Sequence, residues 1–216
     1  MKFNKIDIKN WKRKEVFNHF SNQQTSFSIT KNINITKLYK MTKEKGYKFY
    51  PVFIFLVTHV TNSNKHFRMN FNAEGEFGYW DTVVPLYTIF DKKSDLFSTI
   101  YTNTGEDFKK FHDDYISDTE LYNATGKMFP KTPIPENIVN ISMIPWTSFT
   151  GFNLNMNNNS NYFLPIVTAG GFINENSNIY LPLSLQVHHS VCDGYHAALF
   201  MDRFQALVDN PQELFE

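Results

Sequence analysis

The sequence has one cysteine, no long apolar run and no excess of charge of either sign. Cys192 has no partner for an internal disulfide, and residues 1–7 lack the apolar core of a secretory signal, so we expect a cytoplasmic protein. The longest apolar run, residues 52–57, is about a third of the roughly 20 residues that a membrane span requires. We therefore expect no transmembrane segment and no membrane partner.

The charge balance and the missing phosphate motifs argue against two further classes. Lys plus Arg and Asp plus Glu each number 21, so the net charge is zero and no basic stripe favours a nucleic-acid partner. Neither a GxGxxG pattern nor a GxxxxGKS or GxxxxGKT pattern occurs, so no phosphate-binding loop is predicted. Aromatic residues are abundant instead: the chain has 22 Phe, which favours extensive apolar contact surface and an oligomer.

The distribution of apolar residues predicts both strands and helices. No shift in composition divides the 216 residues, so we predict one domain, residues 1–216. Strands are predicted over residues 25–30, 67–71, 77–80, 83–90, 140–146, 162–168 and 179–187. Helices are predicted over 11–17 with Asn10 as the cap, 36–41 ending near Gly46, a segment starting at Pro51, 106–122 and 197–207, and residues 157–161 are predicted to form a polar loop. This mixture indicates a mixed α/β or α+β domain rather than a doubly wound parallel sheet.

The most informative motif is His189-x-x-x-Asp193-Gly194, which lies between the predicted strand 179–187 and the predicted helix 197–207. A strand-to-helix corner presents side chains at the end of a sheet, where an imidazole can accept a proton near neutral pH. Period-two geometry puts His188 and His189 on opposite faces, so we assign His188 a structural role. From the residues alone, Arg13 is interpreted as solvated, and Asp193 is as readily a helix cap as an ion-pair partner.

Three other kinds of site are conceivable at these residues besides a general base. Cys192 is a possible nucleophile, but a buried corner thiol is inert unless its pKa is depressed. His188, His189 and His196 do not have a zinc-ligand spacing, so no metal is expected. Ser142 could belong to a hydrolase triad, but no Gly-x-Ser-x-Gly elbow surrounds it.

The segment from Pro182 to His196, which contains His189-Ser-Val-Cys-Asp193-Gly194, resembles the signature of the chloramphenicol acetyltransferase family. The His-x-x-x-Asp-Gly pattern alone is also similar in dihydrolipoyl acyltransferase domains. Further segments resemble this family in the same order along the whole chain: Asn10-Trp11-x-Arg13-Lys14-Glu15, Tyr47-Lys-Phe-Tyr-Pro51, Phe129-Pro130, Pro135-Glu136-Asn137, Ile141-Ser142-x-x-Pro145-Trp146 and Phe152-Asn-Leu-Asn155.

The resemblance implies a mixed β-sheet flanked by helices, assembled as a homotrimer with clefts between subunits. It implies direct acetyl transfer from acetyl-CoA to the 3-hydroxyl of chloramphenicol, an antibiotic-resistance reaction with no metal and no acyl-enzyme. His189 matches the general base, and Ser142 matches the serine that stabilises the tetrahedral oxyanion. Thr168 matches a threonine that positions a water, and Asp193 matches an aspartate paired with an arginine, here Arg13.

The resemblance also implies a set of binding residues. Residues at drug-pocket positions are Phe20, Phe27, Phe97, Phe129 and Leu154, and residues near the coenzyme are Lys48 and Tyr50. Phe20 and Ser26 depart from the Tyr and Cys of some members, and Gly171-Phe172 departs from a Lys-Tyr pair. Two alternatives remain: an acyltransferase for another small alcohol or thiol, such as dihydrolipoamide, and a noncatalytic binding protein.

Overall fold

The computed structural model describes residues 2–155 and 162–215, and its largest element is a mixed β-sheet. The strands of this sheet lie in the order β2-β10-β8-β7-β5-β6, and β9 pairs with β10. Their bounds are β2 Ser26–Asn34, β5 Val84–Asp91, β6 Leu96–Tyr101, β7 Ile138–Ile144, β8 Ile166–Gly170, β9 Ile173–Glu175 and β10 Asn178–His188. Strand β7 is parallel to β5 and β8, and the other pairs are antiparallel. The predicted mixed sheet is confirmed.

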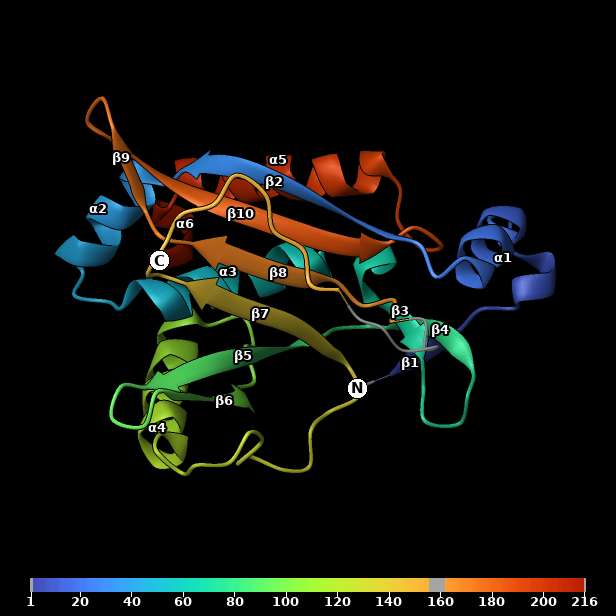
Figure 1. Ribbon diagram of the computed structural model, residues 1–216, viewed down its shortest axis with the longest axis horizontal. Coiled ribbons are helices and arrows are strands. Elements are labelled where there is room, and N and C mark those ends of the chain that lie inside the picture. The colour runs from blue at the N-terminus through green and yellow to red at the C-terminus, as the bar shows by residue number, and fades with distance from the viewer. Residues whose placement is uncertain (1, 156–161, 216) are drawn as a thin grey trace.

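Helices cover one face of this sheet (Figure 1). Their bounds are α2 Thr36–Glu44, α3 Phe49–Asn62, α4 Phe108–Tyr122, α5 Gly194–Asp209 and α6 Gln212–Phe215. Helix α3 is central: residues 51–58 are all buried, and the helix packs against β5, β7, α4 and α5. This burial explains why its sequence is apolar on almost every side. No helix within the described part of the chain is long and apolar enough to cross a membrane.

A smaller antiparallel sheet lies near the N-terminus, with the order β1-β4-β3. Its strands are β1 Phe3–Lys5, β3 Met69–Phe71 and β4 Phe77–Trp80, and β3 and β4 form the predicted hairpin. Gly78 is required by a close approach, because a Cβ there would lie 2.3 Å from the Asn4 carbonyl oxygen. Next to this sheet lie the short 3₁₀ helices η1 Ile8–Asn10 and η2 Lys65–Arg68 and the helix α1 Lys14–Asn22.

Several sequence-based boundaries were wrong. Asn10 does not cap a helix over 11–17: it is the last residue of η1, and its side chain donates to Asp7, the N-cap of η1. Helix α1 begins at Lys14 with Arg13 in the cap position. Pro51 is the third helical residue of α3, still within the first turn that tolerates proline. Strand β6 was not predicted, and β8 begins later than the predicted strand at residue 162. The predicted loop 157–161 lies outside the described residues.

Candidate active site

His189 lies at the corner between the end of β10 at His188 and the start of α5 at Gly194. Its backbone N–H donates to the Thr25 carbonyl, 2.8 Å away, which ties the corner to the residue before β2. The N–H groups of Val191 and Cys192 both donate to the His188 carbonyl and form a tight turn. The corner therefore follows from local turn geometry plus one contact with a neighbouring strand.

The Arg13 side chain holds this corner from the N-terminal side. Its Nη1 and Nη2 donate to the two carboxylate oxygens of Asp193 at 2.6 and 2.5 Å. Its Nε donates to the Ser190 carbonyl at 2.7 Å, and Nη2 also donates to the His189 carbonyl at 2.9 Å. Only 13% of the Arg13 side chain is exposed, so the interpretation of this residue as solvated was wrong. The planar guanidinium matches this set of acceptors in a way an ammonium cannot.

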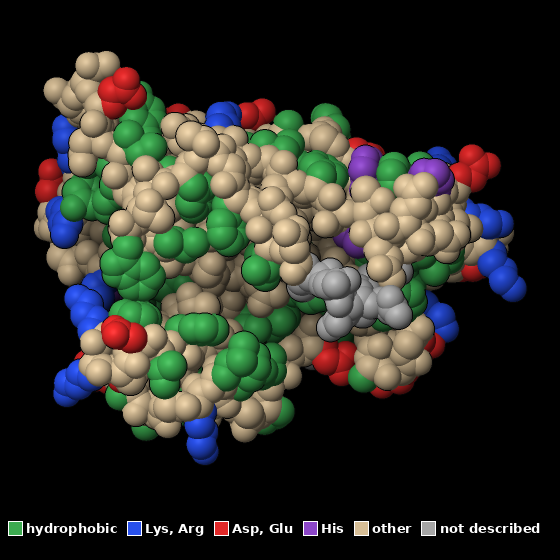
Figure 2. All heavy atoms as spheres, in the orientation of Figure 1, with side chains coloured by type: hydrophobic (Ala, Val, Ile, Leu, Met, Phe, Trp, Pro, Cys, Tyr) green, Lys and Arg blue, Asp and Glu red, His purple; other side chains and the backbone are tan. Residues whose placement is uncertain are grey.

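The imidazole of His189 is stacked on one side and partly open. The Phe20 ring lies parallel to it, with 3.8 Å between ring centroids, and the Phe27 ring lies 5.1 Å away. The ring atom Nδ1 is buried without a hydrogen bond, 3.5 Å from an Asp193 carboxylate oxygen. The side chain is 31% exposed. Figure 2 shows histidine side chains at this end of the molecule, near α1.

His188 and Cys192, the other two residues at the corner that could do chemistry, are both buried. His188 is 4% exposed, packs edge-on against Phe163, and accepts the Ser190 N–H at Nδ1. Burial lowers the pKa of His188 to about 4, so this histidine is neutral near physiological pH. Cys192 is also buried, and burial raises the pKa of its thiol, which disfavours a reactive thiolate.

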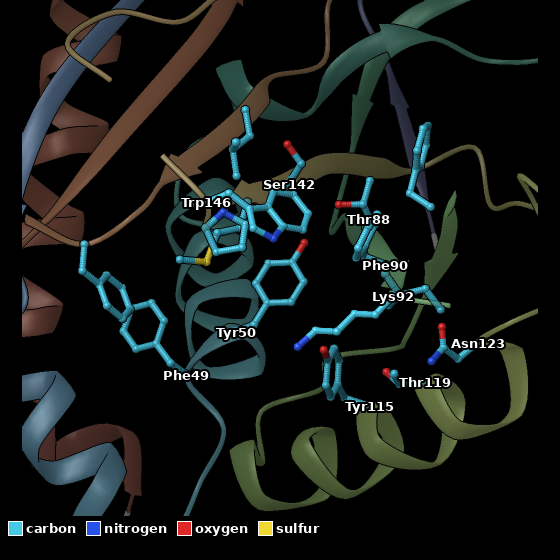
Figure 3. Close-up of a pocket in the computed structure, with 16 residues that line it drawn as sticks. Phe49, Tyr50, Thr88, Phe90, Lys92, Tyr115, Thr119, Asn123, Ser142 and Trp146 are labelled. Carbon is cyan, nitrogen blue, oxygen red and sulfur yellow. The ribbon is translucent and has the colours of Figure 1, made fainter. Parts of the chain in front are cut away.

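Ser142 lies elsewhere, in the wall of a cavity of about 760 Å³. Apolar and aromatic side chains dominate the wall, and Figure 3 shows the Tyr50 ring directed toward Ser142 and Thr88. Burial raises the pKa of the Tyr50 hydroxyl, which therefore remains a neutral hydrogen-bonding group. An apolar cavity with a few polar groups is the usual form of a small-molecule site.

Three hydroxyl groups come together along one row of the sheet. Ser142 on β7 pairs with Thr168 on β8, and their oxygens are 3.3 Å apart. Thr88 is the next residue after the Tyr87–Ile141 pair of β5 and β7, so it flanks Ser142 on the other side. Thr168 in turn pairs with Ser184 on β10. The parallel β7 places Ser142 in the centre of this row.

The predicted site residues fall into two groups within one chain. Thr168 pairs with Ser184, and His189 follows Ser184 by five residues, which corresponds to roughly 16 Å along the strand direction. The corner group contains His189, Asp193, Arg13, Phe20 and Phe27, and the cavity group contains Ser142, Thr168, Tyr50 and Phe97. One chain by itself therefore does not bring His189 to Ser142.

Three predicted binding residues lie outside both groups. Lys48 is exposed in the cap position of α3 and donates its backbone N–H to His112. Leu154 is 48% exposed, and its backbone is held on β10 by the Gln186 side chain. Phe129 is 41% exposed and follows a segment that is hydrogen-bonded to β6.

Sequence reasoning missed several residues of the cavity wall. Thr88, Phe90 and Trp146 line the cavity together with Ser142. The Phe90 and Trp146 rings pack edge to face, with 4.8 Å between their centroids. Thr88 could have been found only from the strand register, because its own segment carries no motif. Steric crowding explains the glycine at position 171: a Cβ there would lie 2.9 Å from the Pro145 carbonyl oxygen. Its neighbour Phe172 lines the cavity.

No group of three or more His, Cys, Asp or Glu side chains is arranged for a metal ion among residues 2–155 and 162–215. Two parts of the site carry groups that can do chemistry, namely the partly open imidazole at the corner and the row of hydroxyl groups. An imidazole can move a proton, and a serine hydroxyl can donate a hydrogen bond to a developing oxyanion.

Known proteins are similar to this chain in sequence and in architecture. The family profile described as chloramphenicol acetyltransferase matches residues 1–205. A chloramphenicol acetyltransferase of Staphylococcus aureus is 66% identical over 213 residues, which cover 99% of each chain. A solved chloramphenicol acetyltransferase structure superimposes with a TM-score of 0.86 at 24% identity, covering 96% of this chain and 100% of the other. A dihydrolipoamide acetyltransferase of Azotobacter vinelandii gives a TM-score of 0.69 at 14% identity, covering 94% and 88%.

The solved structures share the fold of this chain, and the family profile and the curated relatives make it an enzyme of the acyltransferase class. Within that class, the chain belongs to the chloramphenicol acetyltransferase family, because the family profile and the 66% identical relative both span essentially its whole length.

Proposed function

We propose that this protein transfers the acetyl group of acetyl-CoA to the 3-hydroxyl of chloramphenicol, with His189 as the general base. The observation that carries the proposal is the partly open His189 imidazole, stacked on Phe20 and fixed through Asp193 by Arg13, in a chain of this family. The Asp193 carboxylate near Nδ1 favours the tautomer with hydrogen on Nδ1. That tautomer leaves the lone pair of Nε2 free to accept a proton.

The acetyl group passes directly from the thioester to the hydroxyl oxygen, without an acyl-enzyme. His189 removes the hydroxyl proton as the hydroxyl oxygen attacks the thioester carbonyl carbon, and a tetrahedral oxyanion forms. The C–S bond then breaks, and the imidazolium returns its proton to the departing sulfur, so the products are the acetyl ester and the free thiol of CoA. General-base assistance supplies roughly 10²–10⁴-fold, and the fixed orientation of two bound substrates adds to it.

Ser142 is proposed as the donor to the oxyanion, and Thr168 as the group that positions a water beside it. The 3.3 Å contact between their hydroxyl oxygens supports a shared role. The cavity wall is mostly apolar, so a hydrogen bond donated there acts in a medium of low polarity. The loss of such a donor costs on the order of 10²–10³ in turnover.

We propose that the complete site lies between two subunits of a homotrimer. Two observations support it: His189 and Ser142 are far apart within one chain, and large apolar side chains are exposed beside the cavity. Leu96, Phe97, Met128 and Trp146 are each more than half exposed. Figure 2 shows apolar side chains gathered beside a hollow on this face. Such exposed apolar surface favours contact with another copy of the chain.

The two substrates are proposed to bind different parts of this site. Tyr50, which lines the cavity, and Lys48, exposed at the start of the same helix, would contact the coenzyme. Chloramphenicol would contact the apolar side chains of both groups of residues, namely Phe20, Phe27, Phe97, Phe129 and Leu154. The Phe20 ring lacks the hydroxyl that Tyr supplies in some relatives, so it offers the drug an apolar face only.

The direct test mixes the purified protein with chloramphenicol and acetyl-CoA and follows the release of free thiol. We expect rapid release from the parent protein and a loss of about 10³-fold or more for His189→Ala. Equal release from both proteins would refute the role of His189. A panel of other acceptors, including dihydrolipoamide, tests the alternative acyltransferase activity. Activity only towards an acceptor other than chloramphenicol would favour that alternative. Binding of chloramphenicol measured by calorimetry, without any release, would indicate a noncatalytic binding protein.

A further inference from the structure

Two histidines that take no part in the proposed reaction contact the backbone of the corner between β10 and α5. His196 is in the first turn of α5, and its Nδ1 accepts the backbone N–H of Asp193 at 3.0 Å. His66 is in η2, and its Nδ1 lies 2.8 Å from the Val191 carbonyl oxygen. The two imidazole rings are 4.1 Å apart, centroid to centroid. A pair of rings from distant parts of the sequence thus holds the backbone of residues 191–193.

The partners of these rings fix where each hydrogen lies. An amide N–H can only donate, so Nδ1 of His196 must carry a lone pair, and its hydrogen is on Nε2. A carbonyl oxygen can only accept, so Nδ1 of His66 carries the hydrogen. His196 therefore takes the place that Glu or Gln holds in the usual capping box, but with an acceptor that protonation removes.

We propose that His196 is a positioning residue for His189 and that protonation of His196 releases the corner in acid. This inference rests on the proposed function of His189. When Nδ1 of His196 gains a hydrogen, it opposes the N–H of Asp193 instead of accepting from it. The backbone at Asp193 then moves, and with it the Arg13 guanidinium, which donates to both Asp193 carboxylate oxygens and to the His189 carbonyl.

The charged groups around the pair oppose its protonation. Burial lowers the pKa of His196, and the neighbouring His66 and Arg13 lower it further, against the opposing effect of Asp193. Burial also lowers the pKa of His66, Arg13 and Lys65 add to this, and Val191 and Asp193 oppose it. The buried Cys192 thiol, which contacts the His66 carbonyl, is uncharged. Both rings are therefore neutral at physiological pH and charge only in acid.

The test measures kcat/KM of three variants from about pH 8 to about pH 5. The reaction is monitored by the loss of thioester absorbance. His196→Asn keeps an acceptor near the Nδ1 position but cannot be protonated, and His196→Ala removes the acceptor. His59→Asn, which replaces an exposed histidine of α3, is the matched control. We expect the acid limb of log(kcat/KM) to steepen from a slope of about one to about two in the parent and control. It stays near one in His196→Asn.

The two substitutions also separate at neutral pH. His196→Ala should lose about 10- to 100-fold in kcat, because a small displacement of a general base is costly, and His196→Asn should restore most of it. Equal loss in both variants, or an acid limb in His196→Asn that matches the parent, would overturn the proposal. A merely structural role would not remove one ionisation from the pH profile.

A second measurement does not need turnover. In the His189→Ala protein, nitrogen NMR should find Nδ1 of His196 unprotonated at neutral pH, and the Asp193 amide resonance should shift as His196 titrates. An Asp193 amide that stays unchanged through that titration would overturn the proposal. Should the parent protein consume no thioester with any acceptor, the proposed function fails, and this titration still decides the role of His196.

Discussion

The phenyl ring of Phe20 lies parallel to the imidazole of His189, with 3.8 Å between the ring centroids and 3° between the planes. The ring limits how far the imidazole can turn.

Replacement of Phe20 should therefore affect rate through the position of His189. We expect Phe20→Leu to lower kcat by up to about tenfold, because a ring pair of this kind contributes about 0.5–1.5 kcal/mol. Phe20→Tyr keeps the stacked ring and should keep most of the activity. Steady-state kinetics with both substrates measures this difference. A Phe20→Leu protein with the parent kcat would contradict a positioning role for the ring.

The Arg13 guanidinium satisfies four hydrogen bonds at the corner, and lysine cannot reproduce this fork. We expect Arg13→Lys to lose about 10²-fold in turnover, and about 1–3 kcal/mol in the free energy of unfolding. The loss of stability should fall at the low end, because the Asp193 side chain is 40% exposed and solvent screens the pair.

The matched control is Arg203→Lys, since Arg203 is a half-buried arginine of α5, away from the corner, whose side chain donates to Ser63. Urea unfolding and thiol release measured on both proteins separate the two effects. Equal activity in the two variants would show that the fork at Arg13 is dispensable.

Cys192 should be neither nucleophile nor ligand. Because the thiol is buried and burial raises its pKa, we expect no reaction with a thiol reagent at mildly alkaline pH until the protein unfolds. Cys192→Ala should keep turnover within about threefold of the parent. A large loss of turnover, with trapping of an acetyl group on Cys192 in mass spectrometry, would support the acyl-enzyme alternative instead.

Burial of His188 makes stability depend on pH. Its pKa is about 4 in the folded protein and about 6.5 in an unfolded chain, so the unfolded state binds more protons in between. The stability contributed by the neutral ring is complete above about pH 6.5 and is lost as pH falls toward about 4, by about 3 kcal/mol in total.

His188→Asn keeps an acceptor for the Ser190 N–H without the titration, so it should flatten the pH dependence. Urea unfolding of both proteins across this range measures the difference. The same fall in stability in the variant and the parent would assign the effect to other groups.

The sequence predicts those parts of the site whose residues are close together along the chain, and it does not predict contacts between distant residues. The corner could be predicted because His189, Asp193 and Gly194 are neighbours in sequence and strand and helix patterns flank them. Arg13 could not be placed there from its own surroundings, since its partner is 180 residues away, and only the family resemblance joined the two. His66 had no signal at all, because its contacts are with the Val191 carbonyl and the His196 ring.

The sheet shows the same limit. Strand-like composition predicted β5, β7 and β10, but Thr88 and Ser142 became neighbours only through the parallel register of β5 and β7. Strand β6 was missed, although it pairs with β5 in a hairpin along its whole length. The helix cap at Asn10 failed because its side chain binds Asp7 instead of the following helix.

In the proposed intersubunit site, one subunit supplies His189 and another supplies Ser142. The most direct measurement mixes the unfolded His189→Ala and Ser142→Ala proteins, refolds them together and assays thiol release with chloramphenicol and acetyl-CoA. Each variant alone should be nearly inactive. In an evenly mixed oligomer, about a quarter of the interfaces should combine an intact histidine with an intact serine, so about a quarter of the parent activity should return. Mixed oligomers that assemble but remain as inactive as either variant alone would contradict a site shared between two subunits.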